Sequence, residues 1–335
     1  MHTGRRYTPW EFINWTRRDI LWLLFFSAIP TTIYALGAKF LALPWQPVAI
    51  VGTAVAFIVG FKNNASYNRA WEARQIYGAI INDSRSLAYS LRDALGGKQS
   101  QTVQQMFYRH FAWLTALRFQ LREPRAWENL NLENNKEFRK GRYTIPEANT
   151  KLEEELKPYL SEQELKYILS KKNKATQLTA MQSEELAVLR KAGEINDFQW
   201  TLLQQSLTRL TDQQGRAERI KNFPYPRNFA SIATYLLFIF VILAPFALLR
   251  EMERLGDGTI LKGYTLWFNI PFSTMIAWAF HTLDSVGESS VNPFEGNAND
   301  VPITQISRTI EIDMRDMLDE SPLPEPIVPK NNIVL

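Results

Sequence analysis

The sequence predicts an all-α membrane protein with four transmembrane helices and a cytosolic helical bundle. Three observations support this fold class: four apolar blocks, a long charged middle region with helical periodicity, and no segment with strand-like alternation. The four apolar blocks are residues 20–36, 47–61, 230–249 and 264–283. The chain then divides into five regions. Residues 1–61 hold the first two spans, residues 62–228 form a cytosolic helical region, and residues 229–283 hold two further spans. Residues 284–320 form a cytosolic loop and an amphipathic helix, and we expect the tail at 321–335 to be disordered.

Composition excludes several classes of function. The 335 residues contain no cysteine, which rules out disulfides, thiolate catalysis and cysteine-based metal sites. A net charge of +4 gives no reason to expect nucleic acid as a partner. The lipid bilayer is the expected environment, and no cofactor is expected.

The distribution of basic residues predicts the orientation in the membrane. Four arginines precede the first span, one lysine follows it, and four basic residues follow the second span: Lys62, Arg69, Arg74 and Arg85. Because basic residues favour the cytoplasmic side, we expect both chain ends in the cytoplasm of a cell whose plasma membrane, the inner membrane of a bacterium, holds the protein.

The second apolar block stands out because it turns polar without a helix breaker. Residues 47–61 cover only about 22 Å as a helix, less than the ~30 Å hydrocarbon core. Helical spacing places Thr53, Phe57 and Phe61 along one face, which continues with the polar residues Asn64, Asn68 and Glu72. Such a face suits a helix that lines a path, narrow and dry at one end and wet at the other.

The run GFKNNASYNRAWEAR at residues 60–74 resembles the second transmembrane helix of bacterial bestrophins, and Asn292-Pro293-Phe294 is a second shared motif. The resemblance covers about residues 5 to 320. The sequence departs from the family pattern at Ala70–Trp71, with one aromatic where many members have two. The resemblance implies a homopentameric ion channel that passes small monovalent ions passively.

Bestrophin pores have a neck of three hydrophobic rings, and the resemblance assigns these rings to Thr53, Phe57 and Phe61. It assigns a second narrow point, at the cytosolic exit, to Leu178, for which an ordinary core leucine is the alternative. Asn64, Asn68 and Glu72 would line the vestibule between the two.

Calcium-gated animal bestrophins carry a dense acidic run after Asn-Pro-Phe. Here the matching stretch offers only weak calcium candidates, namely Glu295, Asn297, Asn299 and Asp300. Calcium prefers six to eight oxygen ligands, so a solvated polar loop is the alternative interpretation.

The ion that passes is left open by the residues. The family implies chloride-type anion conduction, and a sodium-type cation channel is the alternative. Glu72 favours cations if it faces the vestibule, whereas an ion pair with Arg69 or Arg74 would neutralise it.

A function of another class, a membrane enzyme or transporter, would use His281 and Asp284 near the end of the fourth span. The sequence shows no nucleophile with a base, no metal-ligand cluster and no internal repeat, so the channel is the favoured interpretation. The amphipathic residues 303–317 are expected to pack on a neighbouring subunit.

Overall fold

The computed structural model describes all 335 residues, and they form helices without a β-sheet. The α-helices are α1 Pro9–Ala35, α2 Trp45–Ala94, α3 Gln101–Arg122, α4 Glu133–Arg139, α5 Pro146–Asn149, α6 Leu152–Leu156, α7 Glu162–Leu169, α8 Lys174–Ala192, α9 Asp197–Asn222, α10 Arg227–Arg254, α11 Asn269–Ser290 and α12 Ile303–Asp316, with 3₁₀ turns η1 Lys39–Leu41 and η2 Thr265–Phe268.

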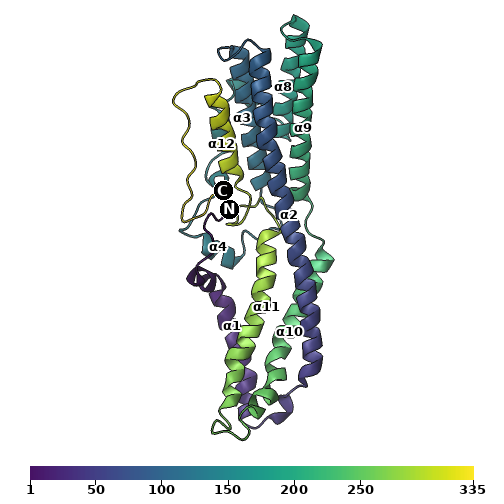
Figure 1. Cartoon of the computed structure of the whole chain (residues 1–335), viewed down its shortest axis with the longest axis vertical. Helices are drawn as coiled ribbons and strands as arrows, with labels where there is room; N and C mark the ends of the chain where they lie inside the picture. The colour runs from purple at the N-terminus through teal and green to yellow at the C-terminus, as the bar shows by residue number, and fades with distance from the viewer.

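A single helix, α2, runs almost the whole length of the elongated molecule (Figure 1). Its 50 residues form one continuous helix, about 75 Å long at 1.5 Å per residue. The prediction that the second apolar block continues as a helix into the polar region is therefore confirmed. One half of α2 belongs to a slender four-helix part and the other half to a broader bundle.

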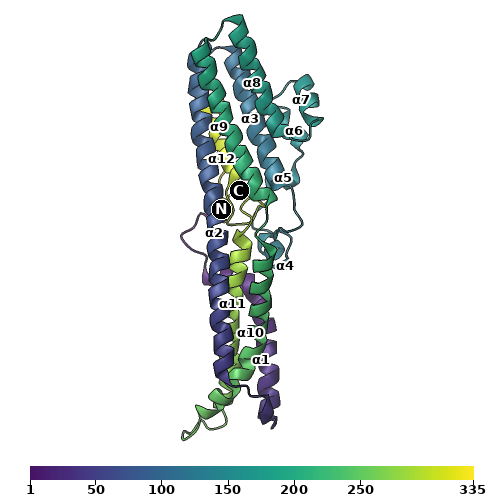
Figure 2. The ribbon, with the colours of Figure 1, turned by 90° about the vertical axis from the view of Figure 1, so that its right-hand side faces the viewer.

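The four-helix part consists of α1, the first half of α2, α10 and α11, which lie side by side (Figures 1 and 2). By length and composition, α10 and α2 could each cross a membrane. Asn269 ties three of these helices together, since its Nδ2 donates to Thr31 Oγ1 at 2.8 Å and to the Pro245 carbonyl at 3.1 Å. Such side-chain bonds satisfy polar groups where no water is present.

The broader bundle consists of the second half of α2 with α3, α8, α9 and α12, and shorter helices cover its flank (Figure 2). Its interior is apolar, with Phe107 and Trp113 of α3 almost fully buried. The amphipathic α12 buries Ile310 and Met314 against α2 and α3 of its own chain. The expectation that this face packs on a neighbouring subunit is therefore wrong.

Arginines of α3 hold the short flanking elements in place. Arg109 donates to Glu164 of α7 at 2.8 Å and to Glu185 of α8 at 3.0 Å. Arg118 donates to the buried Glu147 of α5 at 2.6 Å, and also pairs with Glu155 of α6. Because these carboxylates are partly or fully buried, the pairs fix where the flanking helices sit more than they add stability.

The C-terminal tail is ordered against the rest of the chain, contrary to the expected disorder. Its last three residues, Ile333 to Leu335, are buried, and Ile333 and Leu335 pack with Tyr143 and Ile145. The backbone amide of Thr3 donates to the Asn332 carbonyl at 2.7 Å, so both chain ends meet at mid-height (Figure 1). Residues 321–332 are rich in proline and polar residues, which predicts disorder, whereas the three apolar residues that follow them pack against the chain.

Candidate functional site: an uncovered face of α2

The face of α2 predicted to line a path is left uncovered by the rest of the chain. Phe57 and Phe61 are 66% and 58% exposed, and Thr53 beside them is also exposed. The two phenyl rings meet edge to face, with their centroids 4.5 Å apart. On the opposite side of the helix, Val55 and Val59 are buried. A single chain thus presents large aromatic side chains along a helix whose other side is fully packed.

The face turns polar after Phe61 in the sequence, as predicted. Asn64 and Asn68 are exposed, and Glu72 is half-buried. The partner of Glu72 is different from the expected one, because its carboxylate pairs with Arg219 of α9.

Neither of the nearby arginines of α2, Arg69 and Arg74, makes an ion pair with Glu72. Arg69 points toward the packed side, where it donates to the carbonyls of Val291 and Ile220, each at 2.8 Å. Arg74 is exposed and makes no ion pair. The ion-pair partner of Glu72 therefore comes from another helix, α9.

Leu178 does not reach any open surface. It is completely buried in the core of the bundle, so the alternative interpretation as a core leucine is correct. The surface between α8 and α9 instead carries a polar groove of about 740 Å³. Its lining includes Thr179, Ser183, Thr208, Thr211, Arg216 and Arg219. Helical spacing identifies which residues share a face, but not which of two faces meets the core.

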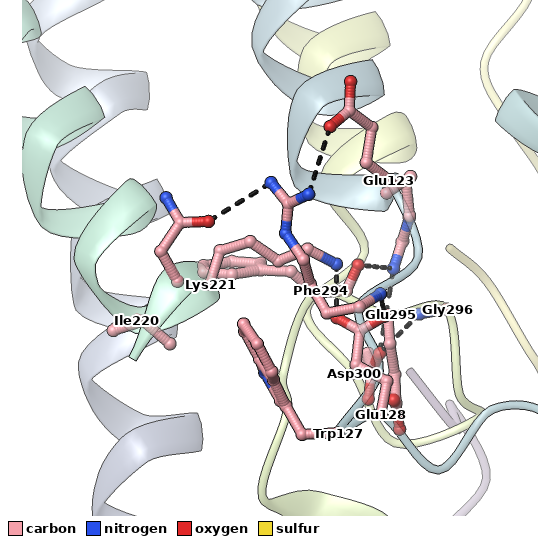
Figure 3. Close-up of polar contacts among 12 residues, drawn as sticks. Glu123, Trp127, Glu128, Ile220, Lys221, Phe294, Glu295, Gly296 and Asp300 are labelled. Atoms are coloured by element: carbon pink, nitrogen blue, oxygen red, sulfur yellow. Dashed lines mark hydrogen bonds and ion pairs between the residues drawn. The ribbon is translucent and has the colours of Figure 1, made fainter. Parts of the chain in front are cut away.

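The loop after α11 brings three of the four calcium candidates together. Figure 3 shows Glu295, Gly296 and Asp300 on this loop next to the buried ion pair of Lys221 with Glu128. Glu295 accepts a hydrogen bond from the Asn129 amide at 2.9 Å and another from the Asn297 side chain. The fourth candidate, Asn299, points elsewhere and accepts from the Tyr7 hydroxyl at 2.8 Å.

These residues do not fit a calcium site. Asp300 Oδ2 accepts from the backbone amides of Gly296 at 2.7 Å and Asn297 at 3.0 Å, and the Arg122 guanidinium lies 3.7 Å away. Donors from this loop and from Asn129 occupy Asp300 Oδ2 and both Glu295 oxygens, so that only Asp300 Oδ1 is left without a partner, and a fixed cation already lies beside this carboxylate. No group of three or more metal-binding side chains occurs in the structure.

His281 and Asp284 do not form the pair that an enzyme or proton relay would need. Asp284 is buried against Lys62 of α2, with Nζ and Oδ1 2.7 Å apart. His281 lies near Asp19 instead, at 4.0 Å. In the sequence, Lys62 indicates the orientation of the chain in the membrane, and its buried partner on α11 is not apparent. A lysine directly after an apolar run was the signal for a buried partner.

The chain is similar to a family profile and to related bacterial proteins along most of its length. A family profile described as Bacterial/Fungal Bestrophin protein matches residues 14–316. The voltage-dependent anion channel-forming protein YneE of Escherichia coli K12 is 29% identical over 90% of this chain and 84% of its own length. The relative of the same description from Synechocystis is 22% identical over 90% of this chain and 87% of its own length.

Solved structures agree with this comparison. A crystal structure of a variant of a bacterial bestrophin homologue from Klebsiella pneumoniae has 26% sequence identity to this chain and a TM-score of 0.72. The match covers 90% of this chain and 98% of the other. The fold of the two chains is therefore the same.

The buried carboxylates of the loop predict a pH-dependent stability. Burial, and then the charge of Asp300, raises the pKa of Glu295 to about 9, and burial raises the pKa of Asp300 to about 6. A group whose pKa is raised on folding stabilises the fold fully below its unfolded pKa and loses that contribution as pH rises through its folded pKa. For Glu295 the loss spans about pH 4.5 to 9.

We expect Glu295→Gln to flatten this dependence. From pH 5 to 9 the unfolding free energy of the wild type should fall relative to the variant, by at most about 1.4 kcal/mol per pH unit. Thermal unfolding in detergent across this range measures it. The exposed Glu194→Gln is the control and should keep the wild-type slope. Parallel slopes for Glu295→Gln and wild type would contradict the prediction.

Proposed function

Because the chain belongs to the bacterial and fungal bestrophin family, we propose that it is an ion channel that passes small monovalent anions passively across the bacterial inner membrane. The observation that carries the proposal is the uncovered face of α2, aromatic at Phe57 and Phe61 and polar from Asn64 onward. Aromatic constrictions control ion flow by excluding water, and polar walls keep the wider part wet. The relatives' description as anion channel-forming proteins supports the same conclusion.

The channel is a cyclic homopentamer in this proposal. Each subunit contributes four membrane-crossing helices, α1, the first part of α2, α10 and α11, and both chain ends lie in the cytoplasm. A single chain leaves the aromatic face of α2 open to one side and encloses no path. Five copies around an axis would turn these faces toward one another, so that Thr53, Phe57 and Phe61 form three rings.

The ion pair of Glu72 favours anions over the cation alternative. A free ring of carboxylates on the cytoplasmic side of the neck would concentrate cations and repel anions. Arg219 neutralises this carboxylate within the same chain. Phenyl rings carry a positive edge that suits an anion, so a neck of phenylalanines is compatible with chloride.

The first test measures ion selectivity. Purified protein in planar bilayers with asymmetric NaCl should show a reversal potential close to the equilibrium potential of chloride. A value close to that of sodium would replace the anion channel with the cation channel. If the protein has the mass of five subunits and yet carries no current, the channel proposal is wrong.

The second test concerns the neck. Replacing both phenylalanines, Phe57→Ala with Phe61→Ala, should raise the single-channel conductance because it widens and hydrates the narrowest part of the path. Phe238→Ala is the matched control, an exposed phenylalanine of α10, and should leave conductance unchanged. Equal conductance for wild type and the double variant, with the oligomeric mass intact, would place the constriction elsewhere.

The third test separates the two roles of Glu72. Arg219→Gln frees the carboxylate and should shift the reversal potential toward cations, whereas Glu72→Gln frees the arginine and should shift it toward anions. Both shifts should be larger at low salt, since the groups are partly exposed and screened. The double variant should restore the wild-type value. Unchanged reversal potentials in both single variants would show that the pair does not face the path.

A further inference from the structure

Lys62 occupies an unusual place for a charged side chain. It follows directly after Phe61, yet it is only 3% exposed. Its Nζ lies 2.7 Å from Asp284 Oδ1 and 3.1 Å from Glu288 Oε1, both on α11. A buried ammonium between two carboxylates holds two helices in one geometry, because either charge left alone would be costly.

The adjacent residues bring α2 and α11 into close contact. Asn63 Nδ2 donates to the Leu283 carbonyl at 3.0 Å. Gly287 faces the same side chain so closely that a Cβ at this position would lie 2.0 Å from Asn63 Oδ1. We call Lys62, Asn63, Asp284, Gly287 and Glu288 the α2–α11 clamp. It combines an ion pair, a hydrogen bond and a contact that only glycine permits.

The clamp lies one residue away from the aromatic ring of Phe61 on the same helix. Successive residues of an α-helix are turned by 100°, so a side chain at 62 fixed against α11 directs the side chain at 61 away from α11. This agrees with the exposure of Phe61 on the uncovered face. Seen along the helix axis, the side chain of Ile58 projects between those of Phe61 and Lys62, and it is half-buried.

We infer that Lys62 is a positioning residue for the neck, and that its ion pair with Asp284 sets the rotation of α2 at the level of Phe61. The inference rests on the proposed function for its consequence, since rotation of five such helices would move five phenyl rings. The alternative is that the pair serves only to join α2 and α11, with no effect on where Phe61 points.

The variants must avoid leaving one charge buried alone. Lys62→Gln by itself strands Asp284, which would destabilise the chain and obscure the result. The neutral variant Lys62→Gln with Asp284→Asn removes both charges and keeps polar side chains. The swapped variant Lys62→Asp with Asp284→Lys restores the attraction with reversed sign. The exposed pair Lys98–Asp319 gives the control, Lys98→Gln with Asp319→Asn.

Orientation can be measured without background because the chain has no cysteine. Single cysteines are introduced as Phe61→Cys or Ile58→Cys, and their reaction rates with a charged, water-soluble thiol reagent are compared. With the clamp intact, the cysteine at 61 should react faster than the one at 58. In the neutral variant the ratio of these rates should fall by about 2- to 30-fold, the range found for residues that bias a conformational equilibrium.

The outcomes are distinct. The swapped variant should recover the rate ratio measured with the clamp intact, and the control pair should not change it. An unchanged ratio in the neutral variant would overturn the inference, as would loss of oligomeric assembly in that variant, because the pair would then act through stability alone. Labelling does not require ion flow. If the single-cysteine chains with the clamp intact label as expected but the wild type carries no current, the channel is refuted and the orienting role of Lys62 stands.

Discussion

The unbroken hydrogen-bond ladder of α2 is the constraint on which the structure depends. A continuous helix cannot turn one level without turning the next, so the side that packs in the four-helix part dictates the side that packs in the bundle. Val55, Val59, Lys62 and Ile76 all belong to this packed side. The opposite side stays open along the same helix, which is how an aromatic segment and a polar segment come to share one surface.

Much of this organisation could be predicted from the sequence. The change from apolar to polar after Phe61 without a helix breaker predicts a long helix with two environments, and helical spacing predicts which residues share the uncovered face. The capping box at Ser161 predicts the start of α7. These are local signals, because they depend on residues within a few helical turns.

The rest depends on partners far away in the chain. Glu72 lies 147 positions from Arg219, and spacing within α2 pointed only to the arginines nearby. Leu178 shows the same limit, since periodicity indicates that a leucine faces something apolar but not whether that is a core or a pore. The tail illustrates it again, because three apolar residues become informative only when Tyr143 and Ile145 are known to lie beside them.

The loop after α11 shows why a motif can be shared while its chemistry differs. Asp300 accepts from two amides of its own loop and lies near Arg122, so the acidic side chains close the loop on itself. Arg122 also donates to the Phe294 carbonyl at 2.8 Å, which ties the loop to α3. In this chain the loop after Asn292-Pro293-Phe294 therefore joins α11 to α3 through contacts within the protein.

The position of the α2–α11 clamp along α2 has a mechanical consequence. From Lys62, the helix extends about 26 Å to its start at Trp45 and about 48 Å to its end at Ala94. A stiff rod held at such a point behaves as a lever with arms of unequal length. A tilt that moves the membrane end of α2 by 1 unit of length moves the far tip almost twice as far in the opposite direction. Forces applied at the tip of the bundle are correspondingly amplified at the Trp45 end of α2, whereas Phe61, one residue from the pivot, hardly moves.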